Sequence, residues 1–551
     1  MPYFVWVKAS SSVPELASYD IDHLGIVAAI IDEIGLVEEI DQLLGTHEQE
    51  VLSSGTTVKA MILNALGFVS APLYLFQEFF VGKATELLLG GGIRPEHLHD
   101  DKLGKVLDKL FEADLTRLFV RVALKAAEHF GVDRGVVHLD ASSFHVHGQY
   151  EPERRSEVVG PGEMPSISIT YGYSREQRSD LKQFVVDLMS TSDSDVPLYF
   201  RAADGNEADK AVFADPVKDF KEQVDLDALF VADSALFSRE NLTSLAGLSW
   251  LTRVPQTLTE AKRLLSELDE GEFEESSLPG YKIAERQVSY GGIPQRWLVI
   301  ASDGAQRRAD KRQGKTLGKQ KRAHDKALRA LSKRSFHCEQ DAKRAIEAFE
   351  KTLTLHRLEE VGIVSKRRYH KRERPSADTP FELLYRVQAK LLRDEKAFHD
   401  QQTCSGRFIL ASNILDSEHY SNDQLLAEYK AQQSAERGFR FLRDPLFFTS
   451  SVFLKTPSRV AALALIMALS LLVYTLGQRL LRQNLAAQKA TIRHQTGRAT
   501  RTPTLRWVFQ MFQAVHLVVL DGVKHISNLT KERQHILGFL SPRCRKYYLL
   551  V

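Results

Sequence analysis

The chain has 551 residues, too many for one small domain, and its 43% hydrophobic and 26% charged residues exclude extensive disorder. The net charge of +2 does not by itself indicate a nucleic-acid partner. Cys338, Cys404 and Cys544 match no metal or redox spacing, which excludes a disulfide framework and predicts a reducing, cytoplasmic location.

The first part of the chain is predicted to be helical. Apolar residues recur every three or four positions from Ile26 to Ile40 and again from Val106 to Leu118. This period predicts a helical N-terminal domain over residues 1–130. The opening MPYFVWVKAS lacks the pattern of an export signal, so none is expected.

The period changes at Gly135, where β-type patterns begin. Val136–Asp140 is predicted to be a short apolar strand followed by a polar loop, and Ser166–Tyr171 alternates as a half-buried strand does. A helix is expected over Asn206–Gln223. Further strands are expected at Gln183–Met189, Leu198–Arg201, Leu229–Asp233 and Trp250–Val254. This order predicts a mixed α/β sheet.

Residues 256–400 interrupt this pattern and are predicted to be an insertion. Lys282–Tyr290 and Gln295–Ile300 flank Gly291-Gly292, as the strands of a hairpin do. Two basic clusters follow, at 307–334 (including Lys319, Lys321 and Arg322) and at 366–374. Such clusters can neutralise phosphates, although a solvated helix surface is the simpler interpretation of charge alone.

The last part of the chain contains a strand at Phe408–Leu410, a helix from Ser421 to Arg443, and the apolar run Val460–Gly477. That run is close to membrane-spanning length, but no second span accompanies it. A buried helix is therefore predicted, and a membrane protein remains an alternative.

Two aspartates and one helix face carry the chemical signal. Asp140 and Asp233 each close a predicted apolar strand, where a carboxylate emerges at a sheet edge. Tyr429, Gln432 and Glu436, with Arg443 seven residues further on, return to one helix face. On geometry alone, an amphipathic helix with chance polar neighbours explains that face equally well.

The spacing Tyr429-x2-Gln432-x3-Glu436-x6-Arg443 resembles the Tyr-x2-Arg-x3-Glu-x6-Lys signature of the DDE transposases of bacterial insertion sequences, in the group of insertion sequence four. The resemblance covers about residues 130–480. It is also carried by LDASSFHVHG, GYSREQRSDLKQ, DGNEAD and VADSALFS, around Asp140, Gly172–Gln183, Asp204–Asp209 and Asp233.

The resemblance implies an RNase H-like mixed sheet flanked by helices, with an insertion before the last catalytic helix. The implied domains are a helical N-terminal domain (1–130), which is the candidate for binding DNA ends, a catalytic core in two parts (131–255 and 401–485), the insertion (256–400) and a C-terminal helical region (486–551).

The resemblance also implies the chemistry. Asp140, Asp233 and Glu436 would be the catalytic and metal-binding residues, with two Mg²⁺ ions, or Mn²⁺ in their place. The substrates would be double-stranded DNA, namely terminal inverted repeats and target DNA, handled by a homodimer on paired ends with no membrane involved. Tyr429, Gln432, Arg443, Lys319, Lys321 and Arg322 would bind DNA.

Two signature positions differ from the family. Arg443 replaces a lysine and keeps the charge, whereas Gln432 replaces an arginine and loses it. Gln432 suggests an inactive DNA-binding relic as one alternative, and a metal-dependent nuclease without strand transfer is another. His138, His145 and His147 are read as polar strand residues, Ser142 and Ser143 as local hydrogen-bonding groups, and Trp297 as a packed residue.

Overall fold

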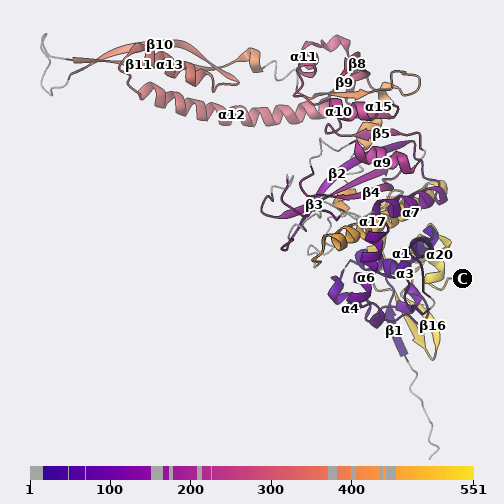
Figure 1. The fold of residues 1–551 in the computed structure, drawn as a ribbon. Coiled ribbons are helices and arrows are strands. Elements are labelled where there is room, and N and C mark those ends of the chain that lie inside the picture. Colours follow the sequence, from indigo (N-terminus) through magenta and orange to yellow (C-terminus); the bar gives the residue numbers. More distant parts are fainter. Residues whose placement is uncertain are drawn as a thin grey trace, which may run out of the picture. The chain divides into compact units, whose positions relative to one another are not determined.

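The computed structural model describes residues 16–47, 49–68, 70–150, 166–172, 178–207, 214–224, 226–369, 381–398, 405–432, 438–441 and 454–550. The chain divides into two compact units. Unit 1 comprises Met1–Thr252 and Ala427–Val551, and unit 2 comprises Arg253–Leu426. Unit 2 is therefore inserted into the sequence of unit 1 (Figure 1). The five domains expected from the sequence stay a prediction.

The front of unit 1 is helical after one short strand, β1 (Leu16–Asp20). Its helices bury apolar faces, and α1 has Ile26, Ile30 and Ile31 fully buried. Three of these helices begin at side-chain caps: Ser53 accepts from the Thr56 amide, His99 from that of Lys102, and Asp114 from those of Thr116 and Arg117. The helices are α1 (Leu24–Ile34), α2 (Leu36–Leu44), α3 (Ser54–Ala65), α4 (Phe76–Phe80), α5 (Thr85–Leu89), α6 (Asp100–Glu112) and α7 (Leu115–His129), with 3₁₀ turns η1 (Leu73–Leu75) and η2 (Pro95–His97).

The centre of unit 1 is a mixed sheet in the order β4-β3-β2-β5-β6. The strands β2, β3 and β4 pair antiparallel, whereas β2–β5 and β5–β6 pair parallel. The mixed α/β sheet expected from the sequence is thus confirmed. The strands are β2 (Val136–Val146), β3 (Lys182–Thr191), β4 (Pro197–Ala203), β5 (Leu229–Ala232) and β6 (Ser249–Arg253).

Helices cover both faces of this sheet. Neighbouring residues of a strand point to opposite faces, and on β4 Phe200 contacts Phe119 of α7 whereas Tyr199 contacts Phe220 of α9 (Asp215–Gln223). A short helix, α10 (Arg239–Ser244), connects β5 to β6. One face therefore carries α7, and the opposite face carries α9.

Two expectations between β2 and β5 were only partly right. Within Ser166–Tyr171 the structure has a single β-bridge, Thr170 with Gln183, rather than a strand. The helix expected from Asn206 begins at Asp215 in the described residues, because Asn206 lies in a turn after Asp204. Residues 208–213 lie outside the described ranges.

The long apolar helix α17 (Pro457–Ala487) forms part of the core of unit 1. Among the described residues it is the one helix long and apolar enough to cross a membrane, and 89% of its most apolar window is buried inside the protein. The predicted buried helix is confirmed. It packs against α3, α6 and α7 and against β4.

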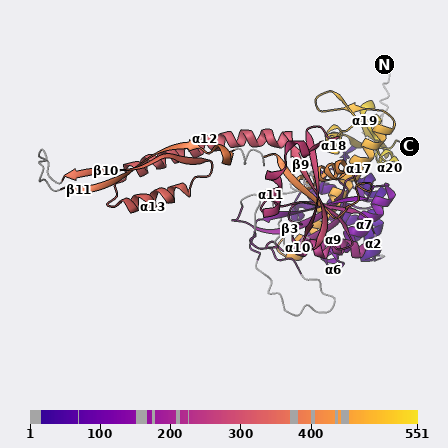
Figure 2. The ribbon, with the colours of Figure 1, turned by 90° about the horizontal axis from the view of Figure 1, so that it is seen from above.

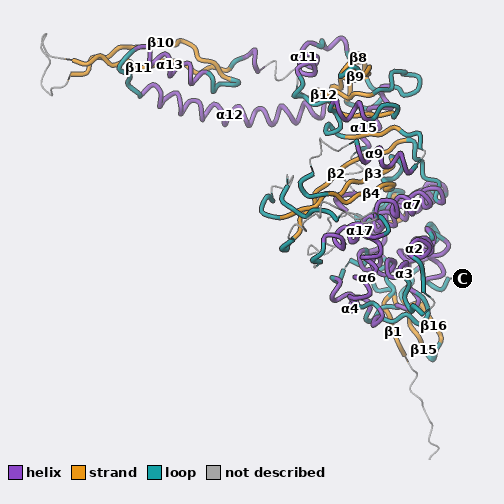
Figure 3. The backbone as a smooth tube through the Cα atoms, viewed as in Figure 1, coloured by secondary structure: helices purple, strands orange, loops and turns teal. Residues whose placement is uncertain are grey.

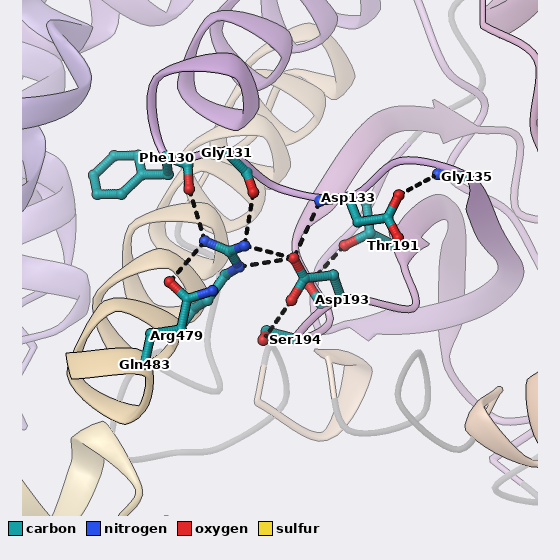
Figure 4. A network of polar contacts seen from close by, with 9 residues as sticks. All are labelled: Phe130, Gly131, Asp133, Gly135, Thr191, Asp193, Ser194, Arg479 and Gln483. Atoms are coloured by element: carbon teal, nitrogen blue, oxygen red, sulfur yellow. Dashed lines mark hydrogen bonds and ion pairs between the residues drawn. The ribbon is translucent and has the colours of Figure 1, made fainter. Parts of the chain in front are cut away.

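One cation of α17, Arg479, joins three parts of unit 1 (Figure 4). Its side chain is 5% exposed, and all five of its N–H groups have acceptors. It donates to the carbonyls of Phe130 and Gly131 at the end of α7, both at 2.8 Å, and to Asp193 Oδ2 at 3.0 and 2.6 Å. The last N–H binds Gln483 of the same helix.

The Asp193 carboxylate carries the network on to the central sheet. Its Oδ2 accepts the Asp133 amide at 3.1 Å, and the Asp133 side chain accepts the Gly135 amide just before β2. Burial acts to raise the pKa of Asp193, but the hydrogen bonds and charge of Arg479 outweigh it, so this pKa lies below its ordinary value.

The C-terminal part of the chain folds back onto the N-terminal part. Strand β15 (His516–Leu520) pairs antiparallel with β1, and α1 packs on α20 (Pro542–Tyr547). The expectation of a purely helical region over 486–551 is corrected, because the region contains four strands beside its helices. The strands are β13 (Ile492–Arg493), β14 (Ala499–Thr500), β15 and β16 (Val523–Ser527), and the helices are α18 (Leu505–Met511), α19 (Lys531–Leu537) and α20.

Unit 2 begins with four neighbouring strands in the order β12-β9-β8-β7. The predicted hairpin is confirmed, since β8 pairs with β9 and Gly291 and Gly292 both adopt positive φ between them. Trp297 on β9 is fully buried, as expected. The elements are α11 (Thr259–Glu267), η3 (Glu270–Glu272), β7 (Glu274–Glu275), β8 (Tyr281–Tyr290), β9 (Ile293–Ser302) and β12 (Arg407–Ser412).

The rest of unit 2 consists of a long helix, a shorter helix and a two-stranded ribbon. The basic run predicted to be helix-prone forms α12 (Asp303–Lys333), which contacts β11 (Phe381–Arg393) (Figures 2 and 3). β10 (His356–Tyr369) pairs with β11, and α13 (Glu339–Glu350) packs on both. Phe336, Ala342, Ile346 and Val387 form the core of this part.

We predict that the buried Arg479 contributes strongly to the stability of unit 1. Replacing it with alanine leaves the half-buried carboxylate of Asp193 and the carbonyls of Phe130 and Gly131 without their donor, so Arg479→Ala should lower the free energy of unfolding by about 3–5 kcal/mol. Arg459 provides a matched control, because it makes two 2.7 Å bonds to Asp108 from the same helix but is 37% exposed. Arg459→Ala should cost at most about 1 kcal/mol. Equal losses in denaturant titrations would contradict this role for Arg479.

The same pair predicts a pH dependence. A carboxylate whose pKa is lowered by folding stabilises the protein above its ordinary pKa, 3.8 for Asp193, and loses this contribution as the pH falls through the folded pKa. The stability difference between the wild-type protein and Asp193→Asn should therefore narrow below about pH 4. Urea titrations at a series of pH values measure it, and a constant difference would argue against the assigned pKa.

Candidate active site

Asp140 and Asp233 lie side by side across the two central parallel strands. The register of β2 and β5 runs from Val136 opposite Leu229 to Leu139 opposite Ala232. Asp140 and Asp233 are the next pair in this register, directly beyond the last paired residues. Neighbouring strands are about 4.8 Å apart, and aligned positions of parallel strands point to the same face. The two carboxylates therefore emerge together at one edge of the β2–β5 pair.

The register also tells which face of the sheet carries the pair. Asp140 lies opposite Leu188 on β3, which lies opposite Phe200 on β4. Phe200 contacts Phe119 of α7. Residues opposite one another in antiparallel strands share a face, so Asp140 and Asp233 lie on the α7 face and not on the α9 face.

Local hydrogen bonds orient both carboxylates. The Ala141 amide donates to Asp140 Oδ1 at 2.9 Å, and the Ala235 amide donates to Asp233 Oδ1 at 2.8 Å. The Thr252 hydroxyl donates to the carbonyl of Asp233 at 2.6 Å and joins this turn to β6. Both aspartates are half-buried. They are thus fixed at the sheet edge but still reached by solvent.

The prediction that Asp140 closes its strand was wrong. Strand β2 continues to Val146, and Ser142, Ser143 and His145 pair in register with Val186, Val185 and Gln183 of β3. These polar residues resemble a loop in sequence because their partners are far away along the chain. Asp140 still marks the end of the pairing with β5.

His138 lies two residues before Asp140 on the same face of β2. It is fully buried, and burial lowers the pKa of its imidazole to about 4, so the ring is neutral at physiological pH. The expectation of a polar strand residue fits its position. His145 is half-buried in the same strand, and His147 is exposed beyond its end.

The helix expected to carry the third acid begins as predicted. In α15 (Asn422–Ala431) the Ser421 amide donates to Gln424 Oε1 at 2.8 Å and the Gln424 amide donates to Ser421 Oγ at 3.2 Å, which is a capping box. Tyr429 lies in α15, and Gln432 lies in the turn after it. Glu436 and Arg443 lie outside the described residues.

Described residues before and after Glu436 in the sequence make contacts near the two ends of β2. Before it, Glu428 Oε2 accepts the Ser192 hydroxyl at 2.8 Å, and the Ser192 amide donates to the Val136 carbonyl at the start of β2. After it, the ring of Phe439 lies 6.4 Å from that of Phe144 near the end of β2. Asp140 lies midway between Val136 and Phe144 and shares a face with Phe144.

Residues 438–441 also pack on α17. The rings of Phe441 and Tyr474 are 4.5 Å apart, and a side chain on Gly438 would come within 3.3 Å of Leu471. The described residues around Glu436 are therefore held between β2 and the long apolar helix.

The donor set at this edge suits a hard cation. Carboxylate oxygens are the ligands that Mg²⁺ prefers, and two of them meet here in register. Within the described residues no group of three or more His, Cys, Asp or Glu side chains could hold a metal ion. A complete site would need a ligand such as Glu436 from outside those ranges.

The predicted DNA-binding cations of the insertion belong to unit 2. Lys319, Lys321 and Arg322 are exposed on α12. The second basic cluster begins on β10, where Lys366, Arg367 and Arg368 are exposed, and continues outside the described residues.

Comparison with known proteins gives limited similarity. Residues 16–124 match the family model described as a domain of unknown function (DUF4277). No curated protein matches the chain. A piggyBac transposase synaptic complex with hairpin DNA is similar at 9% identity over 94% of this chain and 84% of that chain, with a TM-score of 0.36. A Mos1 transposase paired-end complex with the left transposon end is similar at 12% identity over 33% and 56%, with a TM-score of 0.15. Both TM-scores are too low to establish a shared fold.

Sequence reasoning missed the residues that hold the site together. Arg479, Glu428 and Phe439 give no motif, because their partners are distant in sequence. One signal was available: Arg479 is a cation two residues after the apolar run ending at Gly477. A charge beside a buried segment is rarely buried unless it is paired.

Proposed function

We propose that this protein is a DNA transposase whose catalytic residues are Asp140, Asp233 and Glu436. The observation that carries the proposal is the parallel register that brings Asp140 and Asp233 together on one face at the edge of the β2–β5 pair. The proposal includes an RNase H-like fold for unit 1, interrupted by unit 2 before the helix of the third acid.

The contacts of Glu428 and Phe439, described residues on either side of Glu436 in the sequence, are the spatial argument for proposing it as the third acid. The two contacts lie near opposite ends of β2, on either side of Asp140. Glu436 lies between Glu428 and Phe439 in the sequence. The signature spacing from Tyr429 gives independent support for choosing this glutamate.

The three carboxylates would hold two Mg²⁺ ions, or Mn²⁺ in their place. When bound, such ions supply activation of the attacking oxygen and stabilisation of the leaving oxygen in an in-line displacement. The protein's own part is to fix the carboxylates: backbone amides of Ala141 and Ala235 orient the two aspartates.

The reaction would use one site twice. Water attacks the phosphodiester at an end of the element, which releases a 3′-hydroxyl, and this hydroxyl then attacks a phosphodiester of the target DNA. The second step exchanges one phosphodiester for another and needs no further reactant. The DNA partners would be terminal inverted repeats and target duplex, held by a cytoplasmic homodimer on paired ends.

A metal-dependent nuclease without joining is the second candidate function. An inactive DNA-binding relic is the third, suggested by Gln432, since the residue lacks the charge of the family's arginine. A strand-transfer assay separates joining from cutting alone.

We predict that alanine at Asp140, Asp233 or Glu436 abolishes cutting and joining, by roughly 10²-fold or more, while binding of the element's ends is largely kept. The carboxylates hold metal and add little to phosphate attraction. The measurement is Mg²⁺-dependent cleavage of duplexes that carry the DNA flanking the gene. Asp227→Ala is the matched control, because Asp227 is exposed just before β5, at its opposite end.

Circular dichroism of each variant distinguishes a lost site from a lost fold. Substantial cleavage by a folded Glu436→Ala protein would refute its assignment. Equal losses for Asp227→Ala would show that the assay reports damage to β5 rather than chemistry.

We also predict that Arg443 contacts a DNA phosphate beside the one that is cut. Arg443→Ala should reduce affinity and cleavage together and lower the salt slope of binding by roughly one unit. Arg443→Lys should be much milder, because it keeps the charge. If Arg443→Ala leaves both the salt dependence and the cleavage rate unchanged, the signature match at this position is coincidental.

A further inference from the structure

Eight cations form one continuous line along α12. They follow one another in alternating steps of four and three residues, which keeps them within an arc of about 100° at 3.6 residues per turn. At a rise of 1.5 Å per residue the line is about 37 Å long. We call this line the basic stripe: Arg308, Arg312, Lys315, Lys319, Arg322, Lys326, Arg329 and Lys333, all exposed.

The opposite side of α12 packs into unit 2. Leu328 is buried there, and Leu331 packs on the core around Phe336 and Val387. The helix's acidic residues, Asp303, Asp310 and Asp325, also lie off the stripe. The basic stripe therefore faces away from the protein, with no acidic residue in its line.

The cations of the basic stripe are not neutralised within the described part of the chain. No carboxylate there makes an ion pair with any of the eight. Other exposed cations of unit 2 do have partners: Lys343 with Glu339, Arg357 with Glu359, Lys390 with Glu360 and Arg393 with Glu395. Neighbouring like charges weaken a helix, so a bound polyanion would relieve this repulsion.

Two hollows lie beside the stripe. A groove of about 460 Å³ is lined by four of its cations, Arg322, Lys326, Arg329 and Lys333, together with Asp325 and Ala330, so cations outnumber the one carboxylate there. Further toward the start of α12, a cavity of about 870 Å³ is lined by Arg312 and Arg253. Arg407 also lines it, but its buried guanidinium already donates to the carbonyls of Leu265 and Leu268. Guanidinium groups suit phosphate oxygens, which they can bind in a bidentate way.

We propose that the basic stripe binds the phosphate backbone of double-stranded DNA without regard to base sequence, and that it holds the target duplex. The stripe is about as long as one turn of B-form DNA, roughly 34–36 Å. Its members are all Lys or Arg on one narrow side, with no Asn or Gln among them to read adenine. DNA as the partner rests on the proposed function.

The experiment compares two double variants of the full-length protein that remove the same charge from the same helix. Lys315→Gln with Lys319→Gln lies in the stripe. Arg307→Gln with Arg334→Gln is the control, since both residues are exposed but lie about 90° around the helix from the stripe's centre, Arg334 being the C-cap of α12. The probe is a random-sequence 40-bp duplex, titrated over a range of salt concentrations.

The stripe variant should bind on the order of tenfold more weakly at 0.15 M salt and lower the salt slope by about two units. The control variant should bind like the wild-type protein. Equal losses would show that net charge alone matters and would overturn the proposal. So would equal competition by polyglutamate, which would make this a surface for acidic proteins.

Strand transfer separates this inference from the proposed function. The stripe variant should join ends to target DNA less well while cutting the element's ends at the wild-type rate. Normal joining by a stripe variant would overturn the inference alone. Cleavage that survives in Asp140→Ala would overturn the proposed function, whereas stripe-dependent binding of the random duplex would still stand.

Discussion

The buried Arg479 guanidinium is the contact on which the rest of unit 1 depends. It fixes the end of α7 through two carbonyls and the β3–β4 turn through Asp193. Asp193 in turn holds Asp133, three residues before β2. The neighbouring Ser192 binds both the start of β2 and Glu428 of α15. One cation therefore organises the strand that bears Asp140 and the helix that leads toward Glu436.

Sequence patterns predicted the secondary structure of segments whose apolar residues or turn glycines form a clear local pattern. The apolar strands β3, β4, β5 and β6, the β8–β9 hairpin and the buried helix α17 all follow from local periodicity. Prediction failed where pairing partners decide the structure. The polar second half of β2 is a strand because β3 lies beside it, and β15 is a strand because it pairs with β1 and β16. Neither partner is visible locally.

The candidate site shows the same division. Asp140 and Asp233 stood out because each follows an apolar run, but their common face depends on a register that spans 93 residues at every pair. No local sequence pattern predicts which residue of β5 pairs with which residue of β2. Glu436 was chosen from the spacing of its neighbours, and the contacts at Glu428 and Phe439 now give a spatial reason for the choice. The line of cations on α12, in contrast, can be predicted from the local sequence alone, because it depends only on their spacing within one helix.

The insertion of unit 2 has a consequence for how the chain is made. Unit 1 cannot complete its fold until the ribosome has synthesised unit 2, which ends at Leu426. Two parts of unit 1 come later in the chain: Arg479, and the strand β15 that pairs with β1. At 5–20 residues per second, the stretch from residue 252 to β15 takes on the order of 15–50 s to synthesise. During that time the first strands of unit 1 lack their covering helix α17, and their apolar faces are open to chaperones or to aggregation. Unit 2, whose residues are contiguous, can fold in that interval.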